Sequence, residues 1–199
     1  MSSALKAISA REYLRRERTA QTKSEFFQGE MFAMAGGSAN HSLIAANFLG
    51  EVRQALKEKS CVAYNSDLRV KVHPTGLYTY PDATIVCGTR RFEDELNDTL
   101  LNPTLIAEVL SDSTEQYDRG RKSEHYRQID SLQEIVLISQ ATVHIECYTR
   151  QPQGGWLMKE EKRLTATVHF ASLGVSIALS ELYRHVDFKV GSDKNSDTN

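Results

Sequence analysis

The chain has 199 residues, of which 40% are hydrophobic and 25% are charged, an ordinary composition for one globular domain. Its formal net charge of −2 argues against a strongly basic module that binds nucleic acid without specificity. The start of the sequence resembles no signal peptide, and no apolar run is long enough to span a membrane, so we expect a cytoplasmic protein with no membrane partner.

The first third of the chain predicts a short helix, a hairpin and a long helix. Ser9 followed by Glu12 is a capping-box pattern that opens a helix over REYLRRER. Aromatic residues and methionines flank Gln28-Gly29, which is typical of a hairpin turn. We expect Asn40 to cap a helix that reaches about Lys59. Its buried stripe is predicted from residues spaced four apart, namely Ile44, Phe48, Val52 and Leu56.

The rest of the chain predicts several strands with one helix among them. Residues 61–72 alternate as a strand, a second strand follows Pro81, and a polar loop covers residues 88–102. Residues 105–110 form a continuous apolar run, typical of a strand buried on both faces. A helix is expected over 115–129 and a last small helix from Ser180. The remaining strands are expected at 134–139, 143–149 and 156–160, and near Val168 and Ile177.

This order predicts an α/β (α+β) fold, in which a mixed β-sheet core is flanked by helices. We expect a single domain over residues 1–190 and a disordered polar tail over residues 191–199. The three cysteines, Cys61, Cys87 and Cys147, lie far apart and form no CxxC pair. We therefore expect each to be a small buried residue in a reducing compartment, with neither a disulfide nor a zinc site.

Glu108 is the most informative residue, because it interrupts the apolar run 105–110. A carboxylate in a buried strand costs several kcal/mol unless it is paired or bound to a metal, and a structural ion pair explains Glu108 alone equally well. Asp82 alone is a common turn aspartate after proline, and Lys122 alone a solvated lysine. Together, two carboxylates on adjacent strands and a nearby lysine suit a Mg²⁺ site that hydrolyses a phosphodiester.

Five segments occur in a fixed order along residues 10–186: FFQGEMFAMAGGSANH, NSDLRV, YTYPDATIVCG, NPTLIAEVLSDSTEQYDRGRKSEHYR and SLQEIVLISQ. This set resembles the Uma2 family, also called DUF820, of restriction endonucleases within the PD-(D/E)xK nuclease superfamily. The resemblance implies a restriction-endonuclease-like fold, metal-dependent cleavage of DNA, and Mg²⁺ or Mn²⁺ as the cofactor.

The family pattern transfers to this chain by position. Pro81-Asp82 resembles the PD element, and Glu108 resembles the second acidic element. The lysine expected two residues later is replaced by Leu110, and the resemblance suggests that Lys122 supplies the amine instead. It also implies that Asp82, Glu108 and the Val109 carbonyl ligate the metal, while Lys122 positions the attacking water.

Other polar residues are candidates for the same cleft, each with an ordinary structural alternative: Asp67, His41, Glu25, Glu30 and Tyr126. For Asp67 we favour the alternative, an ion pair with Arg69 or a lysine. Positive charge on the helix 115–129 either meets a nucleic-acid backbone or forms a solvated face. The residues that carry it are Arg119, Arg121 and Arg127.

Two functions follow from these patterns. The first is a metal-dependent endonuclease that acts on DNA, and the second is an inactive nucleic-acid-binding or interaction protein on the same fold. By analogy with the superfamily we expect a homodimer, because cleavage of both strands of a duplex needs two sites or two visits.

Overall fold

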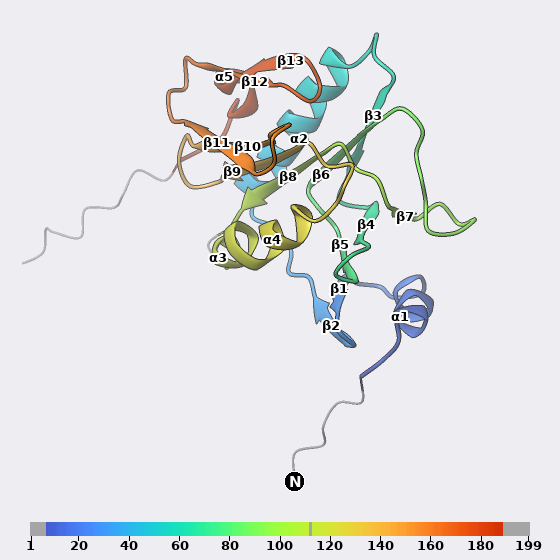
Figure 1. Ribbon diagram of the computed structural model, residues 1–199. Helices are drawn as coiled ribbons and strands as arrows, with labels where there is room; N and C mark the ends of the chain where they lie inside the picture. The colour runs from blue at the N-terminus through green and yellow to red at the C-terminus, as the bar shows by residue number, and fades with distance from the viewer. Residues whose placement is uncertain (1–6, 112, 189–199) are drawn as a thin grey trace, which may run out of the picture.

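The computed structural model describes residues 7–111 and 113–188, and its centre is a six-stranded sheet in the order β11-β10-β9-β8-β6-β3 (Figure 1). Strands β8 and β9 run parallel and the other neighbours run antiparallel, so the sheet is mixed, as predicted. Its strands are β3 (Cys61–Asn65), β6 (Ala83–Cys87), β8 (Leu105–Leu110), β9 (Glu134–Ser139), β10 (Ile145–Arg150) and β11 (Trp156–Glu161).

A second, five-stranded sheet packs over one face of the central sheet. Val70 and Leu77 of this sheet share a buried apolar cluster with Ile106 of β8 and with Tyr126. In sheet order its strands are β2 (Glu30–Ala33), β1 (Ser24–Phe27), β5 (Leu77–Thr79), β4 (Arg69–Val72) and β7 (Thr99–Leu100). The same face is also covered by α3 (Glu115–Tyr117), a π-helical turn η1 (Asp118–Lys122) and α4 (Ser123–Tyr126).

Helix α2 (Ala39–Ala55) covers the opposite face of the central sheet (Figure 1). The predicted stripe of Ile44, Phe48, Val52 and Leu56 is buried there against β6, β8 and β9. The hairpin β12 (Thr167–Phe170) and β13 (Val175–Ala178), with α5 (Leu179–Leu182), completes this layer. Helix α5 begins at Leu179, one residue before the predicted start at Ser180.

The N-terminal predictions are largely confirmed. Ser9 caps α1 (Ala10–Glu17) by accepting a hydrogen bond from the Glu12 N–H. Gln28 and Gly29 have positive φ angles of 49° and 91°, which a two-residue hairpin turn requires. The predicted cap Asn40 is wrong, since Ser38 is the N-cap residue of α2.

Two predicted elements are divided in the structure. Residues 61–72 form two strands, β3 and β4, because Asn65 accepts hydrogen bonds from the N–H groups of Asp67 and Leu68 and closes a turn. The helix predicted over 115–129 is interrupted by the π-helical turn η1, which was not predicted. A π turn often occurs at a functional site, and this one carries Lys122.

The expectation that no cysteines pair was wrong. Cys61 and Cys87 lie directly opposite each other in the antiparallel pair β3–β6 and form a disulfide. Strand register brings them together across 26 residues of sequence, which spacing alone does not reveal. The cysteine argument for a reducing compartment therefore loses its basis. Cys147 is buried and free, as predicted.

Within residues 7–111 and 113–188, no helix has the length and apolar character needed to cross a membrane. The expected tail at 191–199 lies outside the described residues.

Candidate active site

Glu108 lies in the middle of the apolar strand β8 and is only 4% exposed. Its side chain shares a face of the sheet with Ile106 and Leu110, because alternate residues of a strand point the same way. The Tyr126 hydroxyl donates a 2.5 Å hydrogen bond to Glu108 Oε1, and Lys122 Nζ lies 3.0 Å from the same oxygen. The buried Glu108 side chain is therefore paired with one residue of α4 and one of η1.

Lys122 is held by carboxylates from three elements. Its Nζ lies 3.1 Å from Glu25 of β1, 3.0 Å from Glu108 of β8 and 3.4 Å from Asp118 of η1. Burial lowers the pKa of Lys122, but the charges of Glu108, Tyr126, Glu25 and Asp118 outweigh it and raise that pKa well above 10.5. Lys122 is thus an internal ammonium ion that neutralises this acidic cluster.

The acidic surroundings favour the charged form of Lys122 but disfavour the charged form of Glu108. The pKa of Glu108 is raised to about 8, mainly by burial and also by the charges of Asp118 and Asp82, while Lys122 and Tyr126 oppose the rise. Additional positive charge near Glu108 therefore favours its carboxylate form.

Asp82 lies at the junction between β5 and β6, beside the end of β8. Its Oδ2 accepts a 2.8 Å hydrogen bond from the Val109 N–H and lies 3.2 Å from His41 Nε2. The β6–β8 register pairs Ala83 with Ala107, which places Pro81 opposite Val109. Proline has no N–H, so regular strand pairing ends here and the Asp82 side chain takes the Val109 N–H instead.

His41 is placed in the first turn of α2 by its local sequence. Ser38 Oγ accepts a 3.1 Å hydrogen bond from the His41 N–H and donates a 2.6 Å hydrogen bond to Gln140 at the end of β9. A Cβ atom at Gly37 would lie 2.7 Å from His41 Nδ1, so only glycine leaves room for this ring. The Gly-Gly-Ser segment thus fixes the histidine above Asp82.

The surroundings of the His41 ring favour a positive charge beside Asp82. The hydrogen bond to Asp82 raises the pKa of His41 against the effect of burial, and the charges of Asp82 and Glu108 add to the rise. The Val109 carbonyl also raises it as a hydrogen-bond acceptor. The three groups that the sequence predicts as metal ligands are therefore the groups that stabilise a cation here.

The donor set fits a hard divalent cation. Among the residues that the structure describes, no three His, Cys, Asp or Glu side chains are arranged to hold a metal ion. Mg²⁺, however, commonly takes one or two carboxylates and keeps several water ligands. Two carboxylates and a backbone carbonyl meet that requirement. The side chains of Asp82 and His41 are 17% and 19% exposed, against 5% for the Glu108 side chain, so the site is reached from the side of Asp82 and His41.

The auxiliary residues predicted from the sequence separate into two groups. Glu25 and Tyr126 lie in the site, and Glu25 also accepts hydrogen bonds from Thr79 and, at 3.5 Å, from Tyr117. Asp67 instead forms a 2.6 Å ion pair with Lys23 on the surface, the lysine alternative favoured from the sequence. Glu30 is exposed on the edge strand β2.

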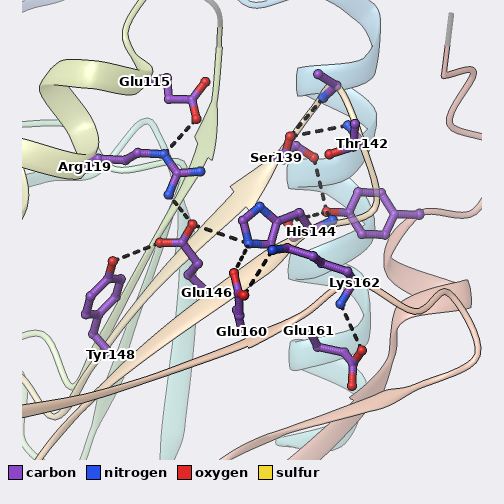
Figure 2. A network of polar contacts seen from close by, with 12 residues as sticks. Glu115, Arg119, Ser139, Thr142, His144, Glu146, Tyr148, Glu160, Glu161 and Lys162 are labelled. Carbon is purple, nitrogen blue, oxygen red and sulfur yellow. Dashed lines mark hydrogen bonds and ion pairs between the residues drawn. The ribbon is translucent and has the colours of Figure 1, made fainter.

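The three arginines predicted to meet nucleic acid are in different environments. Figure 2 shows that Arg119 pairs with Glu115 on its own helix and with the buried Glu146 of β10. The Arg127 guanidinium lies 5.2 Å from the centre of the Tyr148 ring, whereas Arg121 is exposed. Contact of these residues with a nucleic-acid backbone stays a prediction, and Arg121 is the best placed.

Sequence reasoning missed Asp118, Thr79 and Gln140. Asp118 and Lys122 are four residues apart, a spacing typical of a surface ion pair, and nothing in the sequence shows that a π turn buries both. Thr79 belongs to β5, a strand that was not predicted. Gln140 follows β9 and was given no role, although it fixes Ser38.

Comparison with known proteins identifies the family. Two Synechocystis sp. (strain ATCC 27184 / PCC 6803 / Kazusa) proteins, "Uncharacterized protein slr1290" and "Uncharacterized protein sll1609", are each 35% identical to this chain. The matches cover 91% and 85% of this chain, and 94% and 96% of the relatives.

A crystal structure of "a putative nuclease belonging to DUF820" from Anabaena variabilis ATCC 29413 superposes with a TM-score of 0.72 at 20% identity. It covers 88% of this chain and 97% of that one, which confirms the predicted fold. The Uma2 family, described as "Putative restriction endonuclease", matches residues 10–180. The chain therefore belongs to the Uma2 family, as the sequence segments indicated.

Proposed function

We propose that the protein is a metal-dependent nuclease that hydrolyses phosphodiester bonds, with DNA as its substrate. The observation that carries the proposal is that Asp82 binds the Val109 N–H and lies beside His41, while Glu108, the residue before Val109, pairs with Lys122. Membership in the Uma2 family supports the same reaction class.

Each residue has a distinct role in this proposal. Asp82, Glu108 and the Val109 carbonyl would hold Mg²⁺ or Mn²⁺, which when bound lowers the pKa of a water molecule and stabilises charge on the phosphate. Lys122 donates to the attacking water or to a phosphate oxygen. To do so it gives up one carboxylate contact, and the 3.4 Å contact with Asp118 is the longest of the three. Tyr126 holds Glu108 in place through Oε1.

His41 defines the entrance. It contacts Asp82 at 3.2 Å, and both side chains are more exposed than Glu108, so a substrate phosphate approaches past this ring. A duplex cut on both strands needs two such sites or two visits, so we propose that the protein acts as a homodimer. Sedimentation that shows only monomer at micromolar concentration, with and without duplex DNA, contradicts this assembly.

Calorimetric titration of Mn²⁺ near pH 7.5 tests the site without knowledge of the substrate sequence. We expect binding by the wild type, loss of binding by Glu108→Gln, and retained binding by Glu146→Gln. Glu146 is a matched control because it is also a buried glutamate on the central sheet, yet it pairs with Arg119 instead of Lys122. Binding that is insensitive to Glu108→Gln would overturn the metal site.

A cleavage screen then tests the activity on plasmid, single-stranded DNA and RNA. We expect Mn²⁺-dependent products from wild type and Glu146→Gln. The cleavage rate of Glu108→Gln should fall at least 100-fold, which corresponds to a loss of about 2.7 kcal/mol of transition-state stabilisation. Metal binding with stable nucleic-acid binding and no cleavage of any substrate would point to the inactive binding protein instead.

A further inference from the structure

An open pocket lies between β3 and the loop over residues 88–98. Its volume is about 630 Å³. The residues that line it are Tyr64, Gly88, Thr89, Arg90, Phe92 and Asn97. Most of them come from the loop, and Tyr64 comes from the edge strand of the central sheet. No residue of the proposed metal site lines this pocket.

The strand register places Tyr64 on the sheet face that carries Glu108. Tyr64 is opposite Thr84, Thr84 is opposite Ile106, and opposite residues share a face. Thr84 follows Asp82 by two residues and Gly88 follows it by six. At about 3.3 Å per residue, the pocket therefore extends from roughly 7 Å to 20 Å along β6 from Asp82.

The loop that forms the pocket is fixed by hydrogen bonds. The Asn102 side chain accepts a 2.7 Å hydrogen bond from the Arg91 N–H and donates a 2.9 Å hydrogen bond to the Thr89 carbonyl. Phe92 forms a bridge with Leu100. The Gly88 N–H donates to the Ser60 carbonyl at 2.8 Å, beside the disulfide. A long loop held this way presents a preformed surface, which reduces the entropy cost of binding.

The lining combines aromatic, cationic and amide groups. Tyr64 and Phe92 are half-buried, which leaves part of each ring exposed, while Arg90 and Asn97 are exposed. Arg90 Nη1 donates a 3.1 Å hydrogen bond to the Tyr64 hydroxyl, and the guanidinium has further N–H donors for an anion. Aromatic rings stack on bases, arginine meets phosphate, and an asparagine amide both donates and accepts as base edges do.

We propose that this pocket binds an unpaired nucleotide, with the base stacked on Tyr64 and the phosphate on Arg90. An unpaired nucleotide is required because a base in a duplex is stacked on its neighbours and cannot present a free face to an aromatic side chain. The inference goes beyond metal-dependent cleavage, since it assigns a second site for nucleic acid on the same face of the sheet.

The test measures binding of a fluorescein-labelled, mixed-sequence single-stranded DNA 12-mer by anisotropy, in EDTA at low salt. Removal of one stacked base costs about 5- to 150-fold in affinity, so we expect a loss in that range for Tyr64→Ala and less than about 3-fold for Tyr64→Phe. Arg90→Ala should weaken binding more than Arg91→Ala, a matched change at the next exposed arginine of the loop.

Three outcomes would overturn the pocket: Tyr64→Ala that binds like wild type, equal losses for the two arginine variants, or a loss in Tyr64→Ala that is equal for the 12-mer and its duplex. Arg90 is exposed, so Arg90→Ala should remain folded even if Tyr64→Ala does not. If millimolar dTMP displaces the 12-mer, the pocket also binds free nucleotides. If binding depends on Tyr64 but dTMP does not displace the 12-mer, the pocket binds only a nucleotide that is part of a DNA strand.

Calorimetry with Mn²⁺ separates this pocket from the proposed metal site. Tyr64→Ala should bind Mn²⁺ like the wild type, because no residue of the proposed metal site lines the pocket. If Glu108→Gln loses Mn²⁺ binding while Tyr64→Ala loses only the oligonucleotide, both sites stand. If only Glu108→Gln loses Mn²⁺ binding, the metal site is supported and the pocket is not. If only Tyr64→Ala loses the oligonucleotide, the pocket is supported and the metal site is not.

Discussion

Replacement of Lys122 by methionine tests the electrostatic design of the site without reference to any substrate. The substitution keeps most of the side-chain volume and removes the charge. It leaves Glu25, Glu108 and Asp118 around an apolar side chain, and their side chains are only 10%, 5% and 5% exposed. Loss of one partner from a buried ion pair typically costs about 3 to 5 kcal/mol. At roughly 2 to 4 °C per kcal/mol for a chain of this size, Tm should fall by about 6 to 20 °C.

The sign of the pH dependence follows from the same contacts. Lys122 opposes the rise in the pKa of Glu108, so without the ammonium group this folded-state pKa lies further above the unfolded value, and Glu108 binds its proton more tightly in the folded state. The folded variant is then favoured at low pH and loses stability as pH rises through that folded-state pKa. Lys122→Met should therefore be closer to wild type at pH 5 than at pH 8.

Urea unfolding at both pH values, followed by circular dichroism, measures the effect. A double-mutant cycle with Glu108→Gln should give a coupling of at least about 1 kcal/mol, because the second change removes a carboxylate that the first left unpaired. Lys57→Met is the control, since Lys57 is exposed, and should stay within about 0.5 kcal/mol of wild type. A Lys122→Met variant within about 1 kcal/mol of wild type at pH 8, or an effect equal at both pH values, would refute the reasoning.

Three further predictions concern stability. Reduction of the Cys61–Cys87 disulfide, which spans 26 residues, should lower the free energy of unfolding by about 3.5 kcal/mol, and guanidinium midpoints with and without dithiothreitol check this. Tyr126→Phe removes the donor to Glu108 and should cost about 1.5 to 3 kcal/mol in urea unfolding; an unchanged midpoint would contradict that bond. Arginine contacts lower the pKa of Asp98 to about 2. The Asp98 carboxylate therefore stabilises the folded state above pH 4, and this contribution is lost as pH falls through 2. The difference in unfolding free energy between wild type and Asp98→Asn, about 1 to 2 kcal/mol, should vanish over that range in acid titrations.

The sequence predicted the features that depend on local pattern. The stripe of α2 and the buried strand β8 follow from hydrophobic periodicity, and both are buried as expected. Glu108 was informative for the same reason, since a charge in such a strand needs a partner. Ser9 was recognised because a capping box is a contact between residues three apart.

The features that were missed depend on contacts between distant segments. Strand register alone joins Cys61 to Cys87, and the second sheet alone brings Glu25 to Lys122. The π turn adds a residue to a helical turn and so changes which side chains face the sheet, an effect that a 3.6-residue period does not show. Such long-range contacts carry no signal in a single sequence.

Pro81 connects the local motif to the site as a whole. Opposite Val109, any other residue would offer an N–H to the Val109 carbonyl and extend the β6–β8 pairing by one step. Because proline offers none, the edge of β8 opens there: the Val109 N–H is taken by Asp82, and its carbonyl turns to His41. The proline therefore ends the β6–β8 pairing, and the aspartate side chain accepts the Val109 N–H that is left without a strand partner. The cation site that we propose at the end of β8 depends on these two adjacent residues and on Glu108 of that strand.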